Sequence, residues 1–147
     1  MPKIYSFFFC FALAFSSFCQ NESNIERSSY FMFRNSDSAF YFSNKAMNKA
    51  KDSSDYYYGK FLLGQCIFWQ GHIDSSIAYY NSAEFFFTCA KDSLRLMEVY
   101  SETGNALKVN SQYDKSYDYL MKALNIAESI GSLRWQAMLN PPRRRWP

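Results

Sequence analysis

A segment of this chain occurs twice, forty residues apart. The first copy is built on Leu63-Gly64 and the second on Thr103-Gly104, and similar residues follow the two glycines at the same offsets. The matched positions are Ile67, Gly71, Ile73, Ser76, Tyr80 and Ala83 in the first copy, and Leu107, Ser111, Tyr113, Ser116, Leu120 and Ala123 in the second. An internal period of about 20–50 residues is typical of stacked repeat arrays. Repetition on this scale favours binding over catalysis as the function.

The repeated region has the apolar spacing of helices. Large apolar residues recur three or four positions apart, as at Leu62, Cys66 and Trp69, and no stretch alternates with a period of two. Asp and Ser fill the breaks, where their side chains accept hydrogen bonds from the first N–H groups of a helix. The pattern predicts an all-α domain over residues 20–140, with helices at 21–34, 37–51, 56–69, 73–89, 93–109 and 113–129, and a seventh from Ser132 that stops at Pro141-Pro142.

The N-terminal residues have the three parts of an export signal. A short basic start that includes Lys3 precedes the uncharged run from Ile4 to Phe18, and polar residues follow Cys19. Such a segment is removed on export, so we expect a signal peptide over residues 1–19 and a periplasmic or extracellular protein. An uncleaved anchor, or a lipid on Cys19, is the alternative, and either would be the only membrane attachment expected.

The charge balance excludes a general nucleic-acid footprint in the body of the domain. The net charge of +3 comes from Lys3 and from the terminal run Arg143–Arg145. Without these four side chains, 12 basic residues stand against 13 acidic ones. No basic surface for a phosphate backbone is therefore expected between the two ends.

The two copies resemble the tetratricopeptide repeat, which has a Leu-Gly pair, a turn residue, and then a small residue, an aromatic and an alanine at these offsets. The resemblance implies a solenoid of about three helix-turn-helix units wound into a right-handed superhelix. A weaker first copy keeps Ala39, Ser43 and Ala46 but has Arg27 in place of the glycine. The period of about 37–40 residues exceeds the usual 34 of the family.

A narrower resemblance is carried by three runs, Asp37-Ser38-Ala39, Asn44-Lys45-Ala46 and Lys122–Ala127. Together with the export signal and the long repeats, they are similar to the extracytoplasmic sensor regions of bacterial histidine kinases and of membrane-anchored transcriptional regulators. The resemblance implies a bacterial signal-transduction protein with a protein or peptide as its partner.

The same family resemblance implies a peptide-binding groove lined by the first helix of each unit. The residues that match this face are Tyr58, Phe61, Gln65, Phe68, Trp69, Glu98, Ser101, Asn105 and Lys108, and the degenerate first unit offers Ser28, Phe31 and Met32. Packing against a neighbouring unit is the alternative for the aromatic members of this set. The aromatics of the second helix are expected in the core, namely Tyr79, Tyr80, Phe85 and Phe86.

Nothing in the sequence predicts an enzyme, a metal site or a cofactor. His72 is the only histidine and lies in a turn, with no placed nucleophile beside it. Asp37, Asp74 and Asp114 recur at the helix starts, where a negative charge suits the helix dipole. Cys66 and Cys89 either pair in a disulfide or, as we prefer, pack as small apolar residues. An enzyme with an unrecognised site remains the rival from another class.

The last residues break the pattern. The run from Trp135 to Asn140 resembles the opening of a further repeat, but residues 141–147 read Pro-Pro-Arg-Arg-Arg-Trp-Pro instead. We interpret this tail as a truncation or frameshift, with a natural polar tail as the alternative. A non-functional gene fragment is accordingly the other reading of the whole chain.

Overall fold

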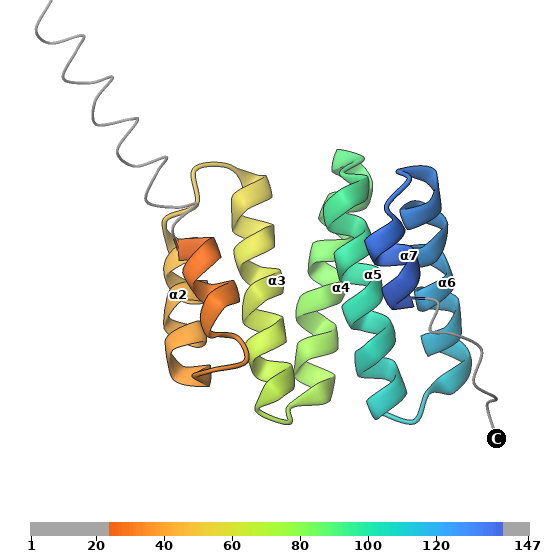
Figure 1. The fold of residues 1–147 in the computed structure, drawn as a ribbon. Helices are drawn as coiled ribbons and strands as arrows, with labels where there is room; N and C mark the ends of the chain where they lie inside the picture. Colours follow the sequence, from red (N-terminus) through yellow and green to blue (C-terminus); the bar gives the residue numbers. More distant parts are fainter. Residues whose placement is uncertain (1–23, 140–147) are drawn as a thin grey trace, which may run out of the picture. The chain divides into compact units, whose positions relative to one another are not determined.

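The computed structural model describes residues 24–139, and all of its regular elements there are helices. The chain divides into two compact units, Met1–Cys66 and Ile67–Pro147, and each is described by itself. Figure 1 follows the helices in chain order. The predicted signal peptide and the predicted tail at 141–147 lie outside the described residues. The all-α prediction is confirmed, and the handedness of the superhelix stays a prediction.

The first unit is a helical hairpin followed by a third helix. A helical segment covers residues 24–31, α2 spans Ser36–Asn48, and α3 begins at Ser53 and ends at Trp69, just inside the second unit. Asn35 starts α2, because its side-chain oxygen accepts a hydrogen bond from Ser38 N at 2.9 Å. The predicted helices at 21–34 and 37–51 are therefore present, although both end a few residues early.

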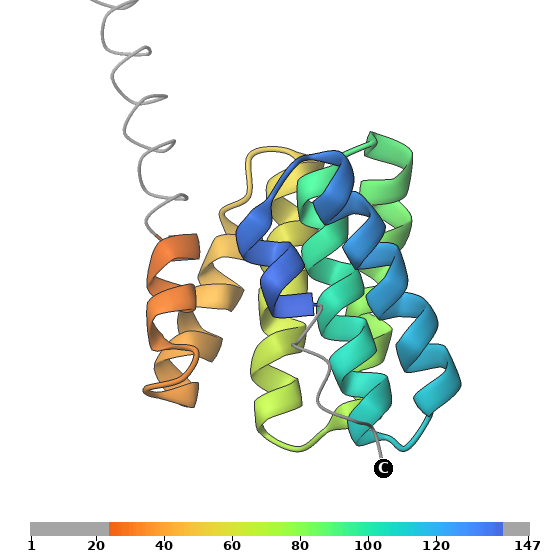
Figure 2. The same ribbon diagram turned by 45° about the vertical axis from the view of Figure 1, so that its right-hand side comes forward.

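The second unit contains four helices that pack in sequence. They are α4 (Ile73–Ala90), α5 (Ser93–Val109), α6 (Tyr113–Ser129) and α7 (Leu133–Leu139). Within this unit α4 packs on α5, α5 on α6, and α6 on α7, with consecutive helices running in opposite directions (Figure 2). The predicted ranges for α4, α5 and α6 agree with the structure to within one residue, and α7 begins one residue after Ser132.

Identical turns give the second unit a period of twenty residues. The residues at positions 71, 91, 111 and 131 all have a positive φ, between 55° and 88°. At each turn the next residue donates its N–H to a carbonyl five residues back, as from His72 to Ile67 and from Gln112 to Leu107. This arrangement is the Schellman motif, which satisfies the last carbonyls of a helix. Helices therefore begin at 73, 93, 113 and 133, and two of them make the forty-residue repeat seen in the sequence.

Small residues bring the helices of the second unit close together. The Ser116 hydroxyl donates a hydrogen bond of 2.8 Å to the carbonyl oxygen of Gly104, and a side chain at Gly104 would meet Leu120 at 2.8 Å. Ala123 and Ala127 are fully buried against Met97. The repeated Gly, Ser and Ala positions are thus contact positions between α5 and α6, as the repeat predicts.

The first unit closes its hairpin with different atoms. The hydroxyls of Ser28 and Ser43 lie 2.6 Å apart, and Ser43 also donates to Ala39 O at 2.8 Å. A side chain at Gly59 would come within 2.8 Å of the backbone nitrogen of Met47, so α3 touches α2 backbone to backbone. The small residues of the weak copy, Ala39, Ser43 and Ala46, are buried as predicted. The hydrogen-bond partner of Ser43 is Ser28, which follows Arg27, the residue that stands in place of the repeat glycine.

Two expectations about packing are wrong. Phe85 was expected in the core and is 74% exposed, whereas its neighbour Phe87 is fully buried. Three successive phenylalanines give no periodic signal, so the helix face that each occupies depends on the exact phase of α4. Cys66 is buried as expected, but Cys89 is exposed, and both are free thiols.

Candidate functional site

The predicted groove residues of α5 form one stripe along that helix. Glu98, Ser101, Asn105 and Lys108 are spaced by three, four and three residues, which places them on one face. Asn105 and Lys108 are exposed and Glu98 is half-buried. Ser101 is only 3% exposed and therefore presents no surface to a ligand. Three of the four predicted positions on α5 remain accessible.

The aromatic members of the predicted groove differ in exposure. Trp69 is exposed and Phe68 half-buried at the end of α3, with their ring centroids 5.4 Å apart and nearly perpendicular. In the first unit Tyr58 and Gln65 are half-buried, but Phe61 is 1% exposed and belongs to the core. Ser28 and Met32 are also buried, so neither lines a groove. The nine residues belong to both units, and one continuous groove through them stays a prediction.

A polar cluster that the sequence did not reveal joins α4, α5 and α6. The Tyr119 hydroxyl donates to the Glu84 carboxylate at 3.1 Å, and the Tyr100 and Tyr119 rings meet edge to face at 5.8 Å. The Lys122 ammonium lies over both rings, 4.6 Å from the Tyr119 centroid. Burial and the nearby Glu84 charge raise the pKa of Tyr119 to about 12, so the phenol stays protonated as a donor. Each member has a partner within the cluster, which therefore holds three helices together.

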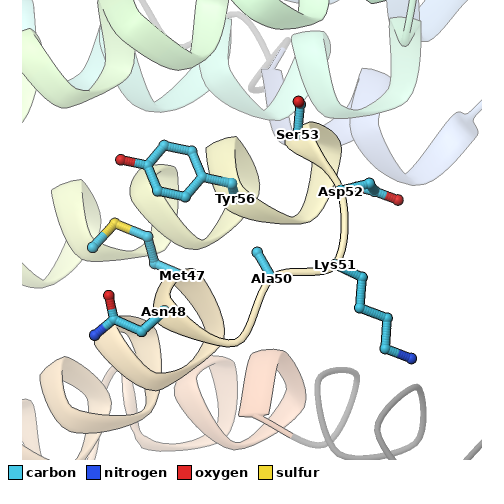
Figure 3. A pocket seen from close by; sticks show the side chains of 7 residues that line it. All are labelled: Met47, Asn48, Ala50, Lys51, Asp52, Ser53 and Tyr56. Atoms are coloured by element: carbon cyan, nitrogen blue, oxygen red, sulfur yellow. The ribbon is translucent and has the colours of Figure 1, made fainter. Parts of the chain in front are cut away.

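A shallow hollow of about 510 Å³ lies at the turn between α2 and α3. It is lined by Met47, Asn48, Ala50, Lys51, Asp52, Ser53 and Tyr56 (Figure 3). The side chains of Lys51 and Tyr56 extend in different directions rather than toward a common point. The hollow therefore lacks the converging polar groups that a small-molecule site needs.

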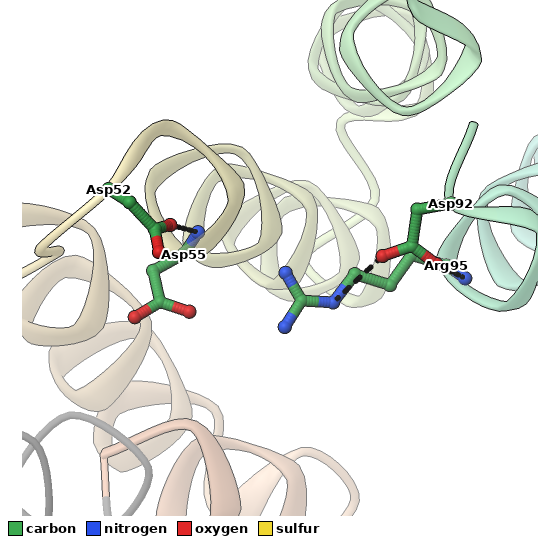
Figure 4. Close-up of polar contacts among 4 residues, drawn as sticks. All are labelled: Asp52, Asp55, Asp92 and Arg95. Carbon is green, nitrogen blue, oxygen red and sulfur yellow. Dashed lines mark hydrogen bonds and ion pairs between the residues drawn. The ribbon is translucent and has the colours of Figure 1, made fainter. Parts of the chain in front are cut away.

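The recurrent acidic residues serve the starts of helices. Asp37, Asp74 and Asp114 lie in the first turns of α2, α4 and α6, as the sequence predicts. Two further aspartates, forty residues apart, are the true caps: Asp52 accepts from Asp55 N at 2.8 Å, and Asp92 accepts from Arg95 N at 3.1 Å (Figure 4). Asp52 and Asp92 thus satisfy helix N–H groups, and the other three place a negative charge at the N-terminal end of a helix.

The described side chains that could act as nucleophiles, bases or metal ligands do not gather at one place. His72 stands at the start of α4 and makes no capping hydrogen bond with its side chain. Between residues 24 and 139, no three His, Cys, Asp or Glu side chains come together as metal ligands would. Burial raises the pKa of the Cys66 thiol, which lies 3.5 Å from the Ser43 hydroxyl. A buried protonated thiol is a poor nucleophile.

Neither protein-family models nor curated proteins give a match to this chain. Among the described helices, none combines the length and the apolar character needed to cross a bilayer. The accessible members of the α5 stripe, Glu98, Asn105 and Lys108, are the candidate functional site.

Proposed function

We propose that this chain is an exported protein- or peptide-binding scaffold of the tetratricopeptide type, acting as the sensor part of a signalling protein. One observation carries the proposal. α5 packs on α4 and on α6, and seven of its residues are buried. Its exposed residues are Ser93 and Leu94 at its start and Asn105, Lys108 and Val109 near its end, and Glu98 between them is half-buried.

The chemistry of this stripe suits an extended peptide. The Asn105 amide offers a donor and an acceptor, which match the N–H and C=O of a peptide backbone. Lys108 and Glu98 place opposite charges ten residues apart, about 15 Å along the helix. The exposed apolar side chains of Leu94 and Val109 lie at the two ends. A peptide with complementary charges would therefore be held in one direction.

A displayed library of random peptides, selected on the full chain, tests this function. We expect selected peptides to lose roughly tenfold in affinity for a variant with Asn105→Ala and Lys108→Ala, because buried polar contacts at an interface are worth about that much. The matched control carries Lys115→Ala and Asp118→Ala on exposed positions of α6. Peptides that bind the α5 variant as tightly as the parent would refute the proposed site. Failure to select any peptide above background would refute the function.

A further inference from the structure

Four aromatic rings form a continuous row on the first unit. Tyr30 and Phe31 come from the segment 24–31, and Tyr41 and Phe42 come from α2. The ring centroids of Tyr30 and Phe31 are 5.1 Å apart, those of Phe31 and Phe42 are 5.7 Å apart, and those of Phe42 and Tyr41 are 5.2 Å apart. The row therefore crosses from one helix of the hairpin to the other.

The row is exposed at both of its ends and carries cations. Tyr30 and Tyr41 are each 57% exposed, and Phe33, in the turn beside Tyr30, is 76% exposed. The Arg34 guanidinium lies 4.3 Å from the centre of the Tyr30 ring, and the Lys45 ammonium lies 5.3 Å from that of Tyr41. A third cation, Arg27, lies 5.4 Å from the centre of the Phe42 ring.

We propose that this aromatic row, with Phe33, Arg27, Arg34 and Lys45, docks on an anionic lipid surface. Tyrosine and phenylalanine rings partition to the headgroup level of a bilayer. Arginine and lysine keep their charged ends among the lipid headgroups while their stems cover apolar surface. Residues 24–49 contain four basic and two acidic side chains, so the unit complements a negative surface. This surface is separate from the α5 stripe, and the proposal does not depend on peptide binding.

The sequence that precedes the aromatic row also favours a lipid surface as its partner. Five residues, 19–23, separate the uncharged run of residues 4–18 from residue 24. Five extended residues span at most about 17 Å. In a chain that keeps this run in a bilayer, as the uncleaved anchor would, the row is therefore held within reach of the headgroups on that side.

A second copy of the chain fits this surface less well than lipid does. In a symmetric dimer the same patch faces itself, so the cations Arg27, Arg34 and Lys45 of one copy would face the cationic patch of the other. Like charges across an interface oppose association. Single-stranded nucleic acid could also stack its bases on the rings and pair its phosphates with the cations. Outside the two ends, however, twelve basic side chains stand against thirteen acidic ones, which gives no extended basic surface for a phosphate backbone.

Flotation of the full chain with vesicles tests the proposal. The probes are phosphatidylcholine vesicles and the same vesicles with about a third of phosphatidylglycerol, a composition that makes the surface anionic. Lys3 and the terminal run Arg143–Arg145 also favour anionic vesicles, so the preference is assigned to the hairpin by comparing variants that keep both ends. At roughly fivefold for each of the three cations, we expect a preference for anionic vesicles on the order of a hundredfold, which falls as salt is raised.

Variants then assign the preference to the row. Replacing Arg34→Gln and Lys45→Gln should lower the ratio by roughly fivefold for each charge. Phe33→Ser and Tyr41→Ser should weaken binding to anionic vesicles while the helix content by circular dichroism is unchanged. The matched control combines Tyr117→Ser and Lys115→Gln on exposed positions of α6, and we expect no change in the ratio.

Three results would overturn the proposal. One is equal binding to neutral and anionic vesicles. Another is a parent-like ratio in both row variants. The third is a different occupant, seen as a dimer in sedimentation that Phe33→Ser abolishes, or as tighter binding of an oligothymidylate than of anionic vesicles at the same salt.

Discussion

The two units build helical hairpins with different turns. In the second unit every interhelical turn places one residue in the left-handed region, at positions 71, 91, 111 and 131. In the first unit the turn before α2 is closed by hydrogen bonds from Arg34 N and Asn35 N to Phe31 O, and the helix end at Lys49 has a φ of −104°. The helix starts are twenty residues apart from α3 at Ser53 onward, and the turns of the second unit keep this spacing, whereas α2 starts at Ser36 and lies outside it.

The contacts between helices differ in the same way. The second unit places a glycine carbonyl against a serine hydroxyl, at Gly104 and Ser116. The first unit uses two hydroxyls, at Ser28 and Ser43, and brings the backbone of α3 against α2 at Gly59. Ser76, at the matching position of the first clear copy, donates instead to Ile73 O at 2.7 Å, so the sequence repeat does not carry this hydrogen bond with it. The weak copy closes its hairpin with other atoms again.

The largest expected effect is at the close approach in the first unit. Gly59→Ala would place its Cβ 2.8 Å from Met47 N and 2.9 Å from Met47 Cα, so α2 must move as a whole. We expect a net loss of about 2 kcal/mol in the free energy of unfolding, because the overpacking cost exceeds the better helix propensity of alanine. Denaturant titration by circular dichroism measures it.

The matched variant in the second unit is Gly104→Ala. Its Cβ would meet the side chain of Leu120 at 2.8 Å and only approach the backbone, at Ser116 O, to 3.3 Å. Because a leucine side chain can rotate, we expect a loss smaller than about 1 kcal/mol. Labelling of the buried Cys66 thiol should become faster in Gly59→Ala, since this thiol reports opening of the first unit. Equal losses in the two variants would mean that the units tolerate crowding alike.

The helix pattern was predictable because it depends on local signals. Asp, Ser and Gly at the breaks predicted the bounds of α4, α5 and α6, which are confirmed, but of these three helices α5 alone has the expected side-chain cap, at Asp92. Gly59 gave no such signal, because its counterpart forty residues on is the buried Val99. A contact that occurs in one repeat alone leaves no repeated residue in the sequence from which it could be predicted.

The candidate site was less predictable than the fold. Their spacing on the confirmed helix α5 puts Glu98, Ser101, Asn105 and Lys108 on one face, and their role in binding stays a prediction. The spacing did not predict that Ser101 is buried, because burial depends on how closely the neighbouring helices pack. The aromatic row of the first unit was missed since Phe31 and Phe42 lie on different helices, and only the hairpin brings their rings to 5.7 Å.

An intermediate effect is expected where the two units are alike. Asp52 and Asp92 are forty residues apart and cap α3 and α5 through the same side-chain bond. Asp52→Ala and Asp92→Ala should each cost about 1 kcal/mol in the free energy of unfolding. The Asp92–Arg95 ion pair, at 3.7 Å and partly exposed, adds little to the second value.

Asparagine variants separate the cap from the charge. Asp52→Asn and Asp92→Asn keep a capping oxygen, so we expect most of the stability to return in thermal and denaturant unfolding. A loss at Asp92→Asn as large as that of alanine would show that the ion pair, rather than the cap, stabilises α5. The two units would then differ at this position as well.

The smallest expected effect is a gain, and it is confined to the second unit. Lys91 and Ser111 have φ values of 55° and 60°, where a Cβ is strained, and they stand at turns whose counterparts are Gly71 and Gly131. Lys91→Gly and Ser111→Gly should each raise the free energy of unfolding by about 0.5 kcal/mol, since relief of strain exceeds the added freedom of the unfolded chain. In the first unit Lys49 has a negative φ, so Lys49→Gly should lower stability instead. If all three glycines destabilised the protein alike, the left-handed turns would not be what sets the regular spacing of the second unit.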